Sequence, residues 1–539
     1  MVGRRKSERG SRGIPLKILV MILIGCLILP GCSRGIPRNH LPEPILTEDA
    51  GLSDLYWKSW ELIDRLKERG NRHNRFPAAY LNPDNADVID QWSVLSTALF
   101  AMYGYTEYPV METLDLFYRK QRADGFIPRS YIVQSGEPLH LPSQADPMIH
   151  PPLFAWVELK YFYLSADTLR LKRVFPSLEN YFRWIDRNCR GKYEADDLYY
   201  ATPIGTGMLN LPRGDVEFGG WTDLSAQMAL FAEQLRQISE ILNDSGKAVY
   251  YRRKYERVAT TIRQKLWDPE SCFYFDITRE GKPARLYTVA GFWALLAGVP
   301  NRPEAIKLIQ HLKDSSAFHL EHMFPTVSIR AEGYNPLGFY WRGGVWGVTN
   351  YMIIQGLLRY NEQDFAREAA WNHLTNMLQV YQGFDVQIDA DSIYFDESLR
   401  HRIWEMYAPE EISPGTRWDA KYYCRKDHIC FSGHGPISML IENVLGFSVN
   451  APADKLVWNI RRQDRHGIQR LRFGDNCVSV WTEPEKELTD VLTINGTTNS
   501  ELVIEIDTET EQFSVHFDAG PIGVAFFPEN YIIRDRFSQ

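Results

Sequence analysis

Apolar side chains recur three and four positions apart along most of the chain, the spacing that places them on one face of an α-helix. The clearest example starts at Asp223 and continues with Leu224, Met228, Phe231, Leu235, Ile238 and Leu242. The pattern predicts about twelve helices, over residues 55–66, 88–103, 111–122, 151–164, 169–188, 223–242, 248–266, 287–296, 305–313, 345–358, 365–381 and 437–445. We expect Gly70 to end the first helix as a C-terminal cap, and Thr222 to cap the helix that starts at Asp223.

The predicted helices follow one another in pairs joined by loops of uneven length, without an obvious short sequence repeat. A regular solenoid would show such a repeat. We therefore expect a mainly α fold in which residues 51–450 close into a double ring of helices, the (α/α)6 toroid. Binding residues tend to lie on loops that a rigid scaffold holds, so long loops at one rim of the ring would carry the site.

The pattern changes from about residue 451, where apolar and polar residues alternate as in half-buried β-strands. Val478 and Val480 show this alternation, and Asn495-Gly496 marks a turn. A small C-terminal β-sandwich domain is therefore predicted for residues 451–539.

The first 32 residues are predicted to be a lipoprotein-type signal peptide that is not part of the fold. Their apolar run, residues 18–29, is too short to cross a bilayer comfortably, because a spanning helix needs about 20 residues. Leu29-Pro30-Gly31-Cys32 resembles the bacterial lipobox, which implies cleavage before Cys32 and lipidation of its thiol. An uncleaved N-terminal anchor is the alternative. Both predict export, with the protein anchored to a bacterial membrane on the periplasmic or cell-surface side.

Residues 33–50 contain Pro37, Pro42 and Pro44 and are expected to form an extended tether. The remaining composition is that of a globular protein, with 44% hydrophobic and 24% charged residues. A formal net charge of -8 gives no basic surface, so nucleic acid is not an expected partner. Aromatic residues reach 13%, with 15 Trp, and those that the core does not use would suit a carbohydrate-lined cleft.

Cysteines predict little chemistry. Without Cys26 and Cys32 an odd number remains, which argues against a complete disulfide framework. Cys424 and Cys430 bracket His428, but a single Cys-x5-Cys lacks a second pair of ligands. A local disulfide or two packed thiols is favoured there, and no metal is assigned.

Two carboxylates stand among aromatic residues and glycines. Asp223 follows Trp221 at the end of Glu217–Asp223, and Glu405 lies between Trp404 and Tyr407. Aromatic rings stack on the faces of sugars, and an apolar wall raises the pKa of a carboxylic acid so that it can donate a proton. A glycosidase is therefore the leading hypothesis.

Further segments support this hypothesis: Gln121–Arg129, His150–Trp156, Tyr340–Trp346 with Asn350 and Tyr351, Glu405–Pro409 and Phe431–Gly433. In this order they resemble the trehalase-like six-hairpin glycosidases, that is, glycoside hydrolase families 37 and 63 and the mannosylglycerate hydrolase-like group. The resemblance spans residues 90–445. It implies the (α/α)6 toroid and an inverting enzyme, in which one carboxylic acid protonates the glycosidic oxygen while a carboxylate activates water on the opposite face.

Carried over residue by residue, the resemblance makes Asp223 the acid, Glu405 the base and Asp90 a ligand of sugar hydroxyls. The other candidate substrate-binding residues are Trp92, Arg129, Trp221, Trp341, Arg342, Trp346, Tyr407 and His434. The chain departs from the family in three places. Glu217 and Asp223 stand further apart than in the family's Glu-Ser-Gly-x-Asp, so Glu217 is an alternative acid. Gly344 replaces a proline, and His434 stands near the base where tryptophan is common.

Structural roles compete with these assignments. Asp223 and Asp90 both stand at predicted helix starts, where a carboxylate is stabilised by the helix dipole. Arg342 can brace the rim through a salt bridge or relieve the burial of Glu405, and the indoles can be core residues.

Two other functions stay open. One is a lyase or sugar epimerase on the same toroid, with His434 or Tyr407 as its base. The other is a non-catalytic glycan-binding surface lipoprotein. The expected partner is an α-linked oligosaccharide or glycoside, either an α-glucoside or an α-mannoside, and neither a metal nor an organic cofactor is needed. The sequence does not predict the oligomeric state.

Overall fold

The structure, a computed structural model, describes residues 35–84, 87–143, 146–214, 216–389, 392–417, 422–484, 492–509, 511–527 and 532–535. The predicted signal peptide, with Cys32, lies outside these residues. Among the residues that are described, we find no helix with the length and hydrophobicity that crossing a bilayer would require.

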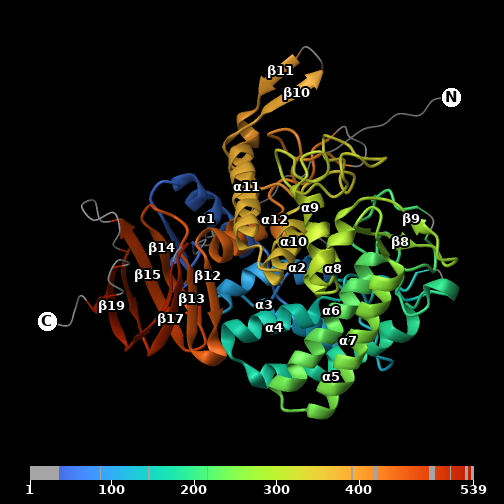
Figure 1. The fold of residues 1–539 in the computed structure, drawn as a ribbon, viewed down its shortest axis with the longest axis horizontal. Coiled ribbons are helices and arrows are strands. Elements are labelled where there is room, and N and C mark those ends of the chain that lie inside the picture. The colour runs from blue at the N-terminus through green and yellow to red at the C-terminus, as the bar shows by residue number, and fades with distance from the viewer. Residues whose placement is uncertain are drawn as a thin grey trace, which may run out of the picture. The chain divides into compact units, whose positions relative to one another are not determined.

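Helices form where the apolar spacing predicts them (Figure 1). The α-helices are α1 (Ala50–Arg65), α2 (Gln91–Ala101), α3 (Val110–Arg119), α4 (Phe154–Ser165), α5 (Thr168–Asn188), α6 (Thr222–Ile241), α7 (Ser245–Lys265), α8 (Trp293–Ala297), α9 (Arg302–Lys313), α10 (Gly347–Arg359), α11 (Gln363–Gln382) and α12 (Ile429–Ser432). A π-helix, η6 (His434–Val444), follows α12 where an α-helix was predicted. The short 3-10 helices are η1 (Arg38–His40), η2 (Met102–Gly104), η3 (Tyr193–Ala195), η4 (Val289–Phe292), η5 (Glu397–Leu399) and η7 (Ala451–Ala453).

The longer strands are mostly in the C-terminal part. Those of the two large sheets are β1 (Glu43–Leu46), β12 (Phe447–Asn450), β13 (Lys455–Asn459), β14 (His466–Phe473), β15 (Asn476–Pro484), β16 (Leu492–Thr498), β17 (Leu502–Asp507), β18 (Gln512–Phe517), β19 (Gly520–Phe527) and β20 (Ile532–Asp535). Small two-stranded sheets lie between the helices: β2 (Lys67–Glu68) with β3 (Tyr80–Leu81), β4 (Val88–Asp90) with β5 (Ser130–Ile132), β6 (Trp267–Asp268) with β7 (Phe273–Tyr274), β8 (Asp276–Ile277) with β9 (Pro283–Ala284), and β10 (Asp385–Asp389) with β11 (Ser392–Phe395).

The even-numbered helices contact one another in a closed series. Helix α2 contacts α4, α4 contacts α6, α6 contacts α8, α8 contacts α10, α10 contacts η6, and η6 contacts α2. Helices α1, α3, α5, α7 and α11 each pack against members of this series. Consecutive helices of a hairpin run in opposite directions, so the N-termini of the even-numbered helices are expected at one common end.

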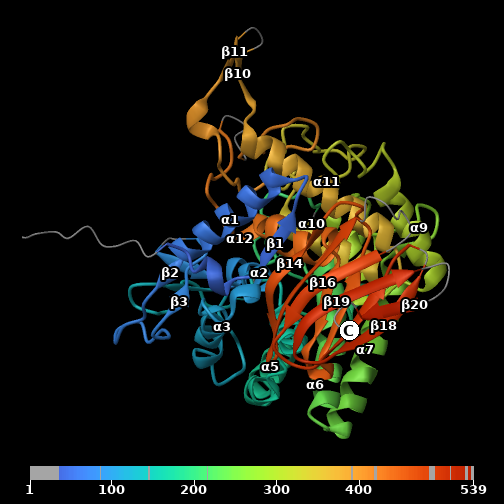
Figure 2. The ribbon, with the colours of Figure 1, turned by 90° about the vertical axis from the view of Figure 1, so that its left-hand side faces the viewer.

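The C-terminal part is a β domain of two sheets, drawn in orange and red in Figures 1 and 2. One sheet has the strand order β1-β14-β15-β16-β19-β20 and the other the order β12-β13-β17-β18. Strands β13 and β17 run parallel. The rings of Trp458 in β13 and His466 in β14 lie 5.7 Å apart and connect the two sheets.

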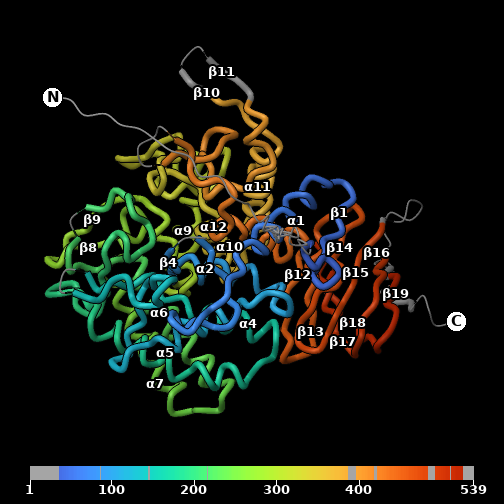
Figure 3. The backbone as a smooth tube through the Cα atoms, turned by 180° about the vertical axis from the view of Figure 1, so that it is seen from behind, coloured from blue at the N-terminus to red at the C-terminus, as the bar shows by residue number. Residues whose placement is uncertain are grey.

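Part of the predicted tether belongs to this β domain. Residues Glu43–Leu46 form β1, which pairs antiparallel with β14, so blue and red segments from opposite ends of the chain lie side by side in Figures 2 and 3. The hydroxyl of Tyr56 in α1 also bonds the carbonyl of Pro42. The tether prediction is therefore wrong from about residue 42 onward, because this extended segment completes the edge of a sheet.

Two predicted helix boundaries also differ. Helix α1 ends at Arg65, before Gly70, because the next residues form β2 and pair with β3. Gly70 permits a close backbone approach instead: a Cβ atom there would lie 2.3 Å from the carbonyl oxygen of Pro77. Helix α2 begins at Gln91 rather than at residue 88, and Asp90 caps it by accepting the backbone N–H groups of Trp92 and Ser93.

Glu442 joins three members of the helix series at one buried carboxylate. It accepts hydrogen bonds from Tyr351 at 2.8 Å, Tyr103 at 3.0 Å and Gln355 at 3.1 Å, and its ion pair with Lys160 measures 3.0 Å. These donors come from α4, α10 and η2, which follows α2, so Glu442 holds η6 against its neighbours.

Glu442→Gln is expected to lower the free energy of unfolding by about 1–3 kcal/mol, because hydrogen bonds to a charged group are lost and the Lys160 ammonium loses its counterion. Thermal or urea unfolding followed by circular dichroism measures the change. Glu256→Gln, an exposed change on α7, is the control and should stay within about 0.5 kcal/mol of the unchanged protein. Equal stabilities of the two variants would contradict the role of Glu442.

Candidate active site

Most candidate residues lie at or just before the N-terminus of an even-numbered helix. Asp90 and Trp92 open α2, Trp221 and Asp223 open α6, and Trp341–Trp346 directly precede α10. The segment with Glu405 leads into α12 and η6. The closed helix series therefore brings together segments that are far apart in the sequence.

Glu405 is a buried carboxylate, 1% exposed, that is held by an arginine. Arg425 Nη2 lies 2.6 Å from Glu405 Oε1, and Arg425 Nε lies 3.1 Å from Oε2. The hydroxyl of Tyr340 donates to Oε1 at 3.0 Å. Burial of the carboxyl acts to raise its pKa, but the hydrogen bonds and charge of Arg425 outweigh this effect, so the pKa of Glu405 lies below its usual value.

Asp223 is fully buried and forms a bidentate ion pair with Arg213. The two bonds measure 3.1 Å to Oδ1 and 2.8 Å to Oδ2, and Arg213 Nε lies 3.1 Å from Asp276 Oδ2. The Arg213 guanidinium also lies 4.4 Å from the ring centroid of Trp221. Two buried carboxylates thus share one cation, and we call these three residues the Asp223–Arg213–Asp276 cluster.

Asp276 both neighbours Asp223 and caps its helix. Burial raises the pKa of Asp276; the Arg213 charge opposes that shift and the Asp223 charge adds to it, and the net change is upward. Its Oδ1 accepts the backbone N–H of Thr222 at 2.8 Å, whereas the Thr222 side chain makes no capping hydrogen bond to α6. The predicted cap by Thr222 is therefore wrong, and Asp276 takes that role.

A single loop connects the two carboxylate centres. Asn210, three residues before Arg213, accepts the Trp341 N–H at 2.8 Å and donates to the Phe339 carbonyl at 3.0 Å. Between those two residues stands Tyr340, which bonds Glu405. The chain segment 210–213 thus links Asp223, through Arg213, to the two residues on either side of Tyr340, whose hydroxyl bonds Glu405.

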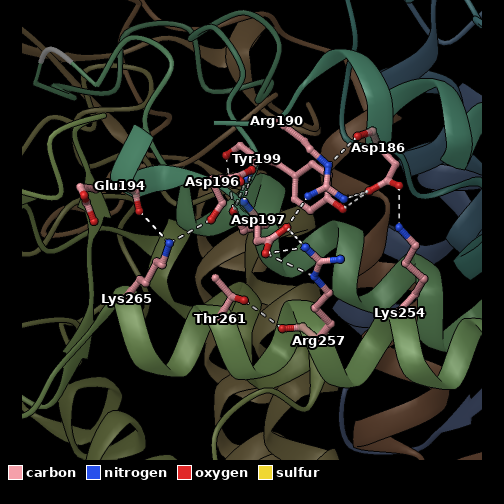
Figure 4. A network of polar contacts seen from close by, with 11 residues as sticks. Asp186, Arg190, Glu194, Asp196, Asp197, Tyr199, Lys254, Arg257, Thr261 and Lys265 are labelled. Carbon is pink, nitrogen blue, oxygen red and sulfur yellow. Dashed lines mark hydrogen bonds and ion pairs between the residues drawn. The ribbon is translucent and has the colours of Figure 1, made fainter. Parts of the chain in front are cut away.

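A polar network supports the other side of the α6 N-terminus (Figure 4). The Tyr199 carbonyl accepts the Trp221 N–H at 2.8 Å, and the Tyr199 hydroxyl donates to Asp186 at 2.7 Å. Lys254 on α7 reaches the same Asp186 at 2.7 Å, and Arg257 binds Asp197. Helices α5 and α7 thereby hold residues 197–199 in place, and the Tyr199 carbonyl in turn holds the backbone of Trp221, two residues before Asp223.

Three of the predicted indoles, Trp92, Trp341 and Trp346, belong to one aromatic group. Trp341 and Trp346 stack with their centroids 4.0 Å apart, and Tyr340 meets Trp346 edge-on at 4.9 Å. Phe431 lies 5.6 Å from Trp346 and 5.8 Å from Trp92. Gly344, where the family has proline, cannot carry a side chain here, because a Cβ atom would lie 2.3 Å from the Tyr340 carbonyl oxygen.

Three further candidates have structural partners. Asp90 accepts a hydrogen bond from His150 Nε2 at 2.9 Å in addition to capping α2, and Arg129 pairs with Asp146 at 3.3 Å. Arg342 donates through Nε to the Asn210 carbonyl at 3.2 Å. The alternative in which Arg342 braces the rim thus has an observed contact, although with a backbone carbonyl rather than a carboxylate.

The remaining candidates lie in different surroundings. The Tyr407 hydroxyl accepts the Trp404 N–H at 3.3 Å, and its ring lies against His322. His434 bonds Ser96 at 3.0 Å and stacks on Tyr351 at 4.8 Å, inside the helix series. Burial lowers the pKa of His434 well below its usual value, so its ring is neutral. Glu217 is exposed.

A cavity of about 690 Å³ adjoins the Glu217–Asp223 segment. Its lining residues are Pro142, Ser143, Pro147, Trp184, Asn188, Lys192, Tyr200 and Phe218. Three of these residues are aromatic, but neither Asp223 nor Glu405 is among them.

The sequence did not predict the two arginines that pair with the carboxylates, Arg213 with Asp223 and Arg425 with Glu405. Arg425 lies in the charged run Cys424–His428, and that run was the only signal that could have pointed to it. Arg213 and Asp276 have no such signal, because they reach Asp223 only through the fold. Cys424 and Cys430 are both free and buried, so of the two alternatives for this pair the local disulfide is wrong.

Comparison with known proteins gives a family match. The family model described as mannosylglycerate hydrolase MGH1-like glycoside hydrolase domain matches residues 100–385. This range contains Asp223 and Arg342 and ends before Glu405.

Individual relatives agree with this match. An uncharacterized protein of Borreliella burgdorferi is 24% identical over 441 residues, 80% of this chain and 88% of that protein. A mannosylglycerate hydrolase of Thermus thermophilus is 35% identical over 99 residues, which is 18% of this chain and 23% of that enzyme. A GH63 mannosylglycerate hydrolase of Thermus thermophilus, solved in complex with glucose, has a TM-score of 0.52 and 21% identity over 68% of this chain and 97% of that one. At this identity the structural likeness shows the fold alone.

Proposed function

Because the chain belongs to the mannosylglycerate hydrolase MGH1-like glycoside hydrolase family, we propose that it hydrolyses an α-linked glycoside with inversion, using Asp223 as the acid and Glu405 as the base. The observation that carries this proposal is the buried Glu405 carboxylate, which Arg425 keeps ionised and which the chain segment 210–213 links to a second buried carboxylate centre.

Glu405 is suited to deprotonate water. A base must be ionised to accept a proton, and the lowered pKa of Glu405 provides the ionised form down to mildly acidic pH. Arg425 and Tyr340 fix the carboxylate orientation, and a water molecule placed against it would lose its proton as it attacks the anomeric carbon.

The Asp223–Arg213–Asp276 cluster supplies the proton in this proposal. Two carboxylates share one guanidinium, so the cluster is one positive charge short of neutrality unless it binds a proton. The raised pKa of Asp276 favours keeping that proton in the cluster. Donation by Asp223 requires Arg213 to release one of its oxygens, and a sugar that enters the site would displace that contact.

We further propose that the closed helix series is the inner ring of an (α/α)6 toroid and that its N-terminal end binds the sugar. The Trp92 indole N–H has no partner among the described residues, although it is buried, which suits a donor to a sugar hydroxyl. Asp90, Arg129, Trp221, Trp341, Arg342 and Trp346 are the other proposed contacts.

An α-mannoside or α-glucoside of a small acceptor is the proposed substrate class, and the name of the Thermus relative makes mannosylglycerate the first compound to test. The test is to incubate residues 33–539 with a panel of α-glucosides and α-mannosides and to follow the released sugar by NMR. The β-anomer as first product supports inversion. The α-anomer as first product would refute it.

Arg425→Met is expected to move the acidic limb of the kcat/KM profile to higher pH by about 1–3 units. Arg425 lowers the pKa of Glu405, so its loss raises that pKa. The base is active only when ionised. As the pH falls, Glu405 in the variant would become protonated at a higher pH than in the unchanged protein, and activity would be lost there. Arg402→Met removes a nearby arginine that pairs with Asp427 instead, and its profile should not move. An unshifted profile in Arg425→Met would contradict the base assignment.

The bidentate Arg213–Asp223 pair also favours a second candidate, a glycan-binding protein without turnover. A guanidinium that holds both oxygens of a carboxylate leaves it unable to donate a proton. Saturable sugar binding without any product across the same panel would establish this candidate.

We also propose export and lipid anchoring through Cys32, which rest on the N-terminal sequence. Metabolic labelling with a fatty acid tests both: label is expected in the full chain and absent from Cys32→Ser.

A further inference from the structure

Three potential metal ligands converge beside the proposed base. Cys430 Sγ lies 2.8 Å from His428 Nε2, and the same nitrogen lies 3.6 Å from Asp84 Oδ1. One donor atom from each residue falls within 4.8 Å of the others. We call these residues the Asp84–His428–Cys430 cluster. Its aspartate comes from a segment far earlier in the chain, which is why the sequence alone offered only Cys424, Cys430 and His428 as possible ligands.

The cluster is enclosed by the protein. Cys430 is fully buried, and the side chains of His428 and Asp84 are 7% and 16% exposed. A thiolate, an imidazole and a carboxylate form the donor set that Zn²⁺ and similar thiophilic cations prefer. The 3.6 Å between His428 Nε2 and Asp84 Oδ1 is close to the roughly 3.5 Å between ligands that bond lengths of 2.0–2.3 Å give around a tetrahedral ion. The 2.8 Å between Cys430 Sγ and His428 Nε2 is a hydrogen-bond distance and would lengthen when an ion replaces the proton. Three protein ligands leave a fourth position open.

The local charges favour a cation. Arg425 Nη1 lies 3.2 Å from Asp84, while the same guanidinium binds Glu405. One arginine thus faces two carboxylates. Arg425, Asp84 and Glu405 together carry one net negative charge. A divalent cation and an ionised Cys430 thiol would bring the net charge of the five groups to zero, which reduces the cost of burying them.

We propose that the Asp84–His428–Cys430 cluster is a binding site for a thiophilic divalent cation of the Zn²⁺ class. As the cation binds, the Cys430 S–H bond breaks, the sulfur electron pair forms the metal bond and the proton leaves to solvent. No electron is transferred. The imidazole nitrogen and the Asp84 oxygen complete the protein ligands.

Binding has a consequence for the proposed reaction, and this part rests on the proposed function. Asp84 is also a partner of Arg425, and Glu405 shares that arginine. A bound cation competes with Arg425 for Asp84 and places positive charge near Glu405. That charge stabilises the Glu405 carboxylate and weakens it as a base, so the cation should inhibit hydrolysis reversibly.

The binding test uses Co²⁺ as a spectroscopic probe on chelator-treated protein. The unchanged protein is expected to show a near-ultraviolet thiolate-to-Co²⁺ charge-transfer band that Zn²⁺ abolishes by displacement. Cys430→Ser should lose the band, and Asp84→Asn should bind at least about tenfold more weakly. Cys424→Ser is the matched control, since Cys424 is also buried and free but instead contacts the Met406 carbonyl, and it should keep the band. Circular dichroism verifies that each variant is folded, and His428→Asn replaces Cys430→Ser if that variant is not.

The cation site is refuted if the unchanged protein shows no charge-transfer band, if Cys430→Ser keeps it, or if Cys424→Ser loses it equally. Zn²⁺ inhibition of hydrolysis, reversed by a chelator and weakened in Cys430→Ser, tests the consequence separately. A charge-transfer band in a protein that hydrolyses no glycoside would refute the proposed function and leave the cation site standing.

Discussion

Glu405→Gln is expected to lower kcat for α-glycoside hydrolysis by about 10²–10⁴-fold, the usual contribution of a general base. Glutamine keeps the size of the side chain and can still contact Arg425 and Tyr340, but it cannot accept the proton of an attacking water. The substrate should still bind, so KM should change less than kcat. Initial rates on the best substrate of the panel measure both constants.

Azide separates a lost base from a damaged site. This small anion needs no deprotonation, so it should restore turnover in Glu405→Gln and produce a glycosyl azide of inverted configuration. Glu410→Gln, an exposed change in the same loop, should leave the rate unchanged. Retained activity in Glu405→Gln without azide would favour the lyase or epimerase, in which His434 or Tyr407 is the base.

Local patterns were sufficient to predict the helices but not their ends. The three-and-four spacing of apolar residues located α6, α7, α10 and α11, of which α7 and α11 bury one face and α6 and α10 are buried on nearly all sides. The ends depend on partners that are remote in sequence. Thr222 looked like a cap, but the N-terminus of α6 is bonded by Asp276, which stands in another hairpin. Residues 43–46 looked like a tether, since nothing local reveals that β14 is their partner.

The same distinction holds for the site. Motifs of aromatic residues and glycines identified Asp223 and Glu405, because those motifs are contiguous in the chain. The arginines that form ion pairs with the two carboxylates are not contiguous with them: Arg213 and Arg425 are brought in by loops between helices. Sequence reasoning therefore predicted which carboxylates to examine, but it offered water or Arg342 as the partner of Glu405, where the structure has Arg425.

Asp223→Asn is expected to lower kcat on an unactivated α-glycoside by about 10²–10⁴-fold, while hydrolysis of the matching α-glycosyl fluoride is affected far less. An ordinary alkoxide leaving group needs a proton from the enzyme, whereas fluoride leaves without one. The ratio of the two rates therefore reports proton donation and not binding or folding. Because the amide cannot neutralise Arg213, the variant is also expected to be less stable, which thermal unfolding would measure.

Glu217→Gln and Asp276→Asn complete this comparison, because the Asp223–Arg213–Asp276 cluster offers more than one carboxyl group. If Asp223 is the acid, Glu217→Gln should behave as the unchanged protein does on both substrates. Asp276→Asn should slow both by a similar factor, since it disturbs the position of Asp223 and the start of α6 rather than the proton itself. A loss confined to the unactivated substrate in Glu217→Gln would transfer the acid role to Glu217. The same selective loss in Asp276→Asn alone would mean that the proton held in the cluster reaches the sugar from Asp276, with Arg213 keeping Asp223 ionised throughout.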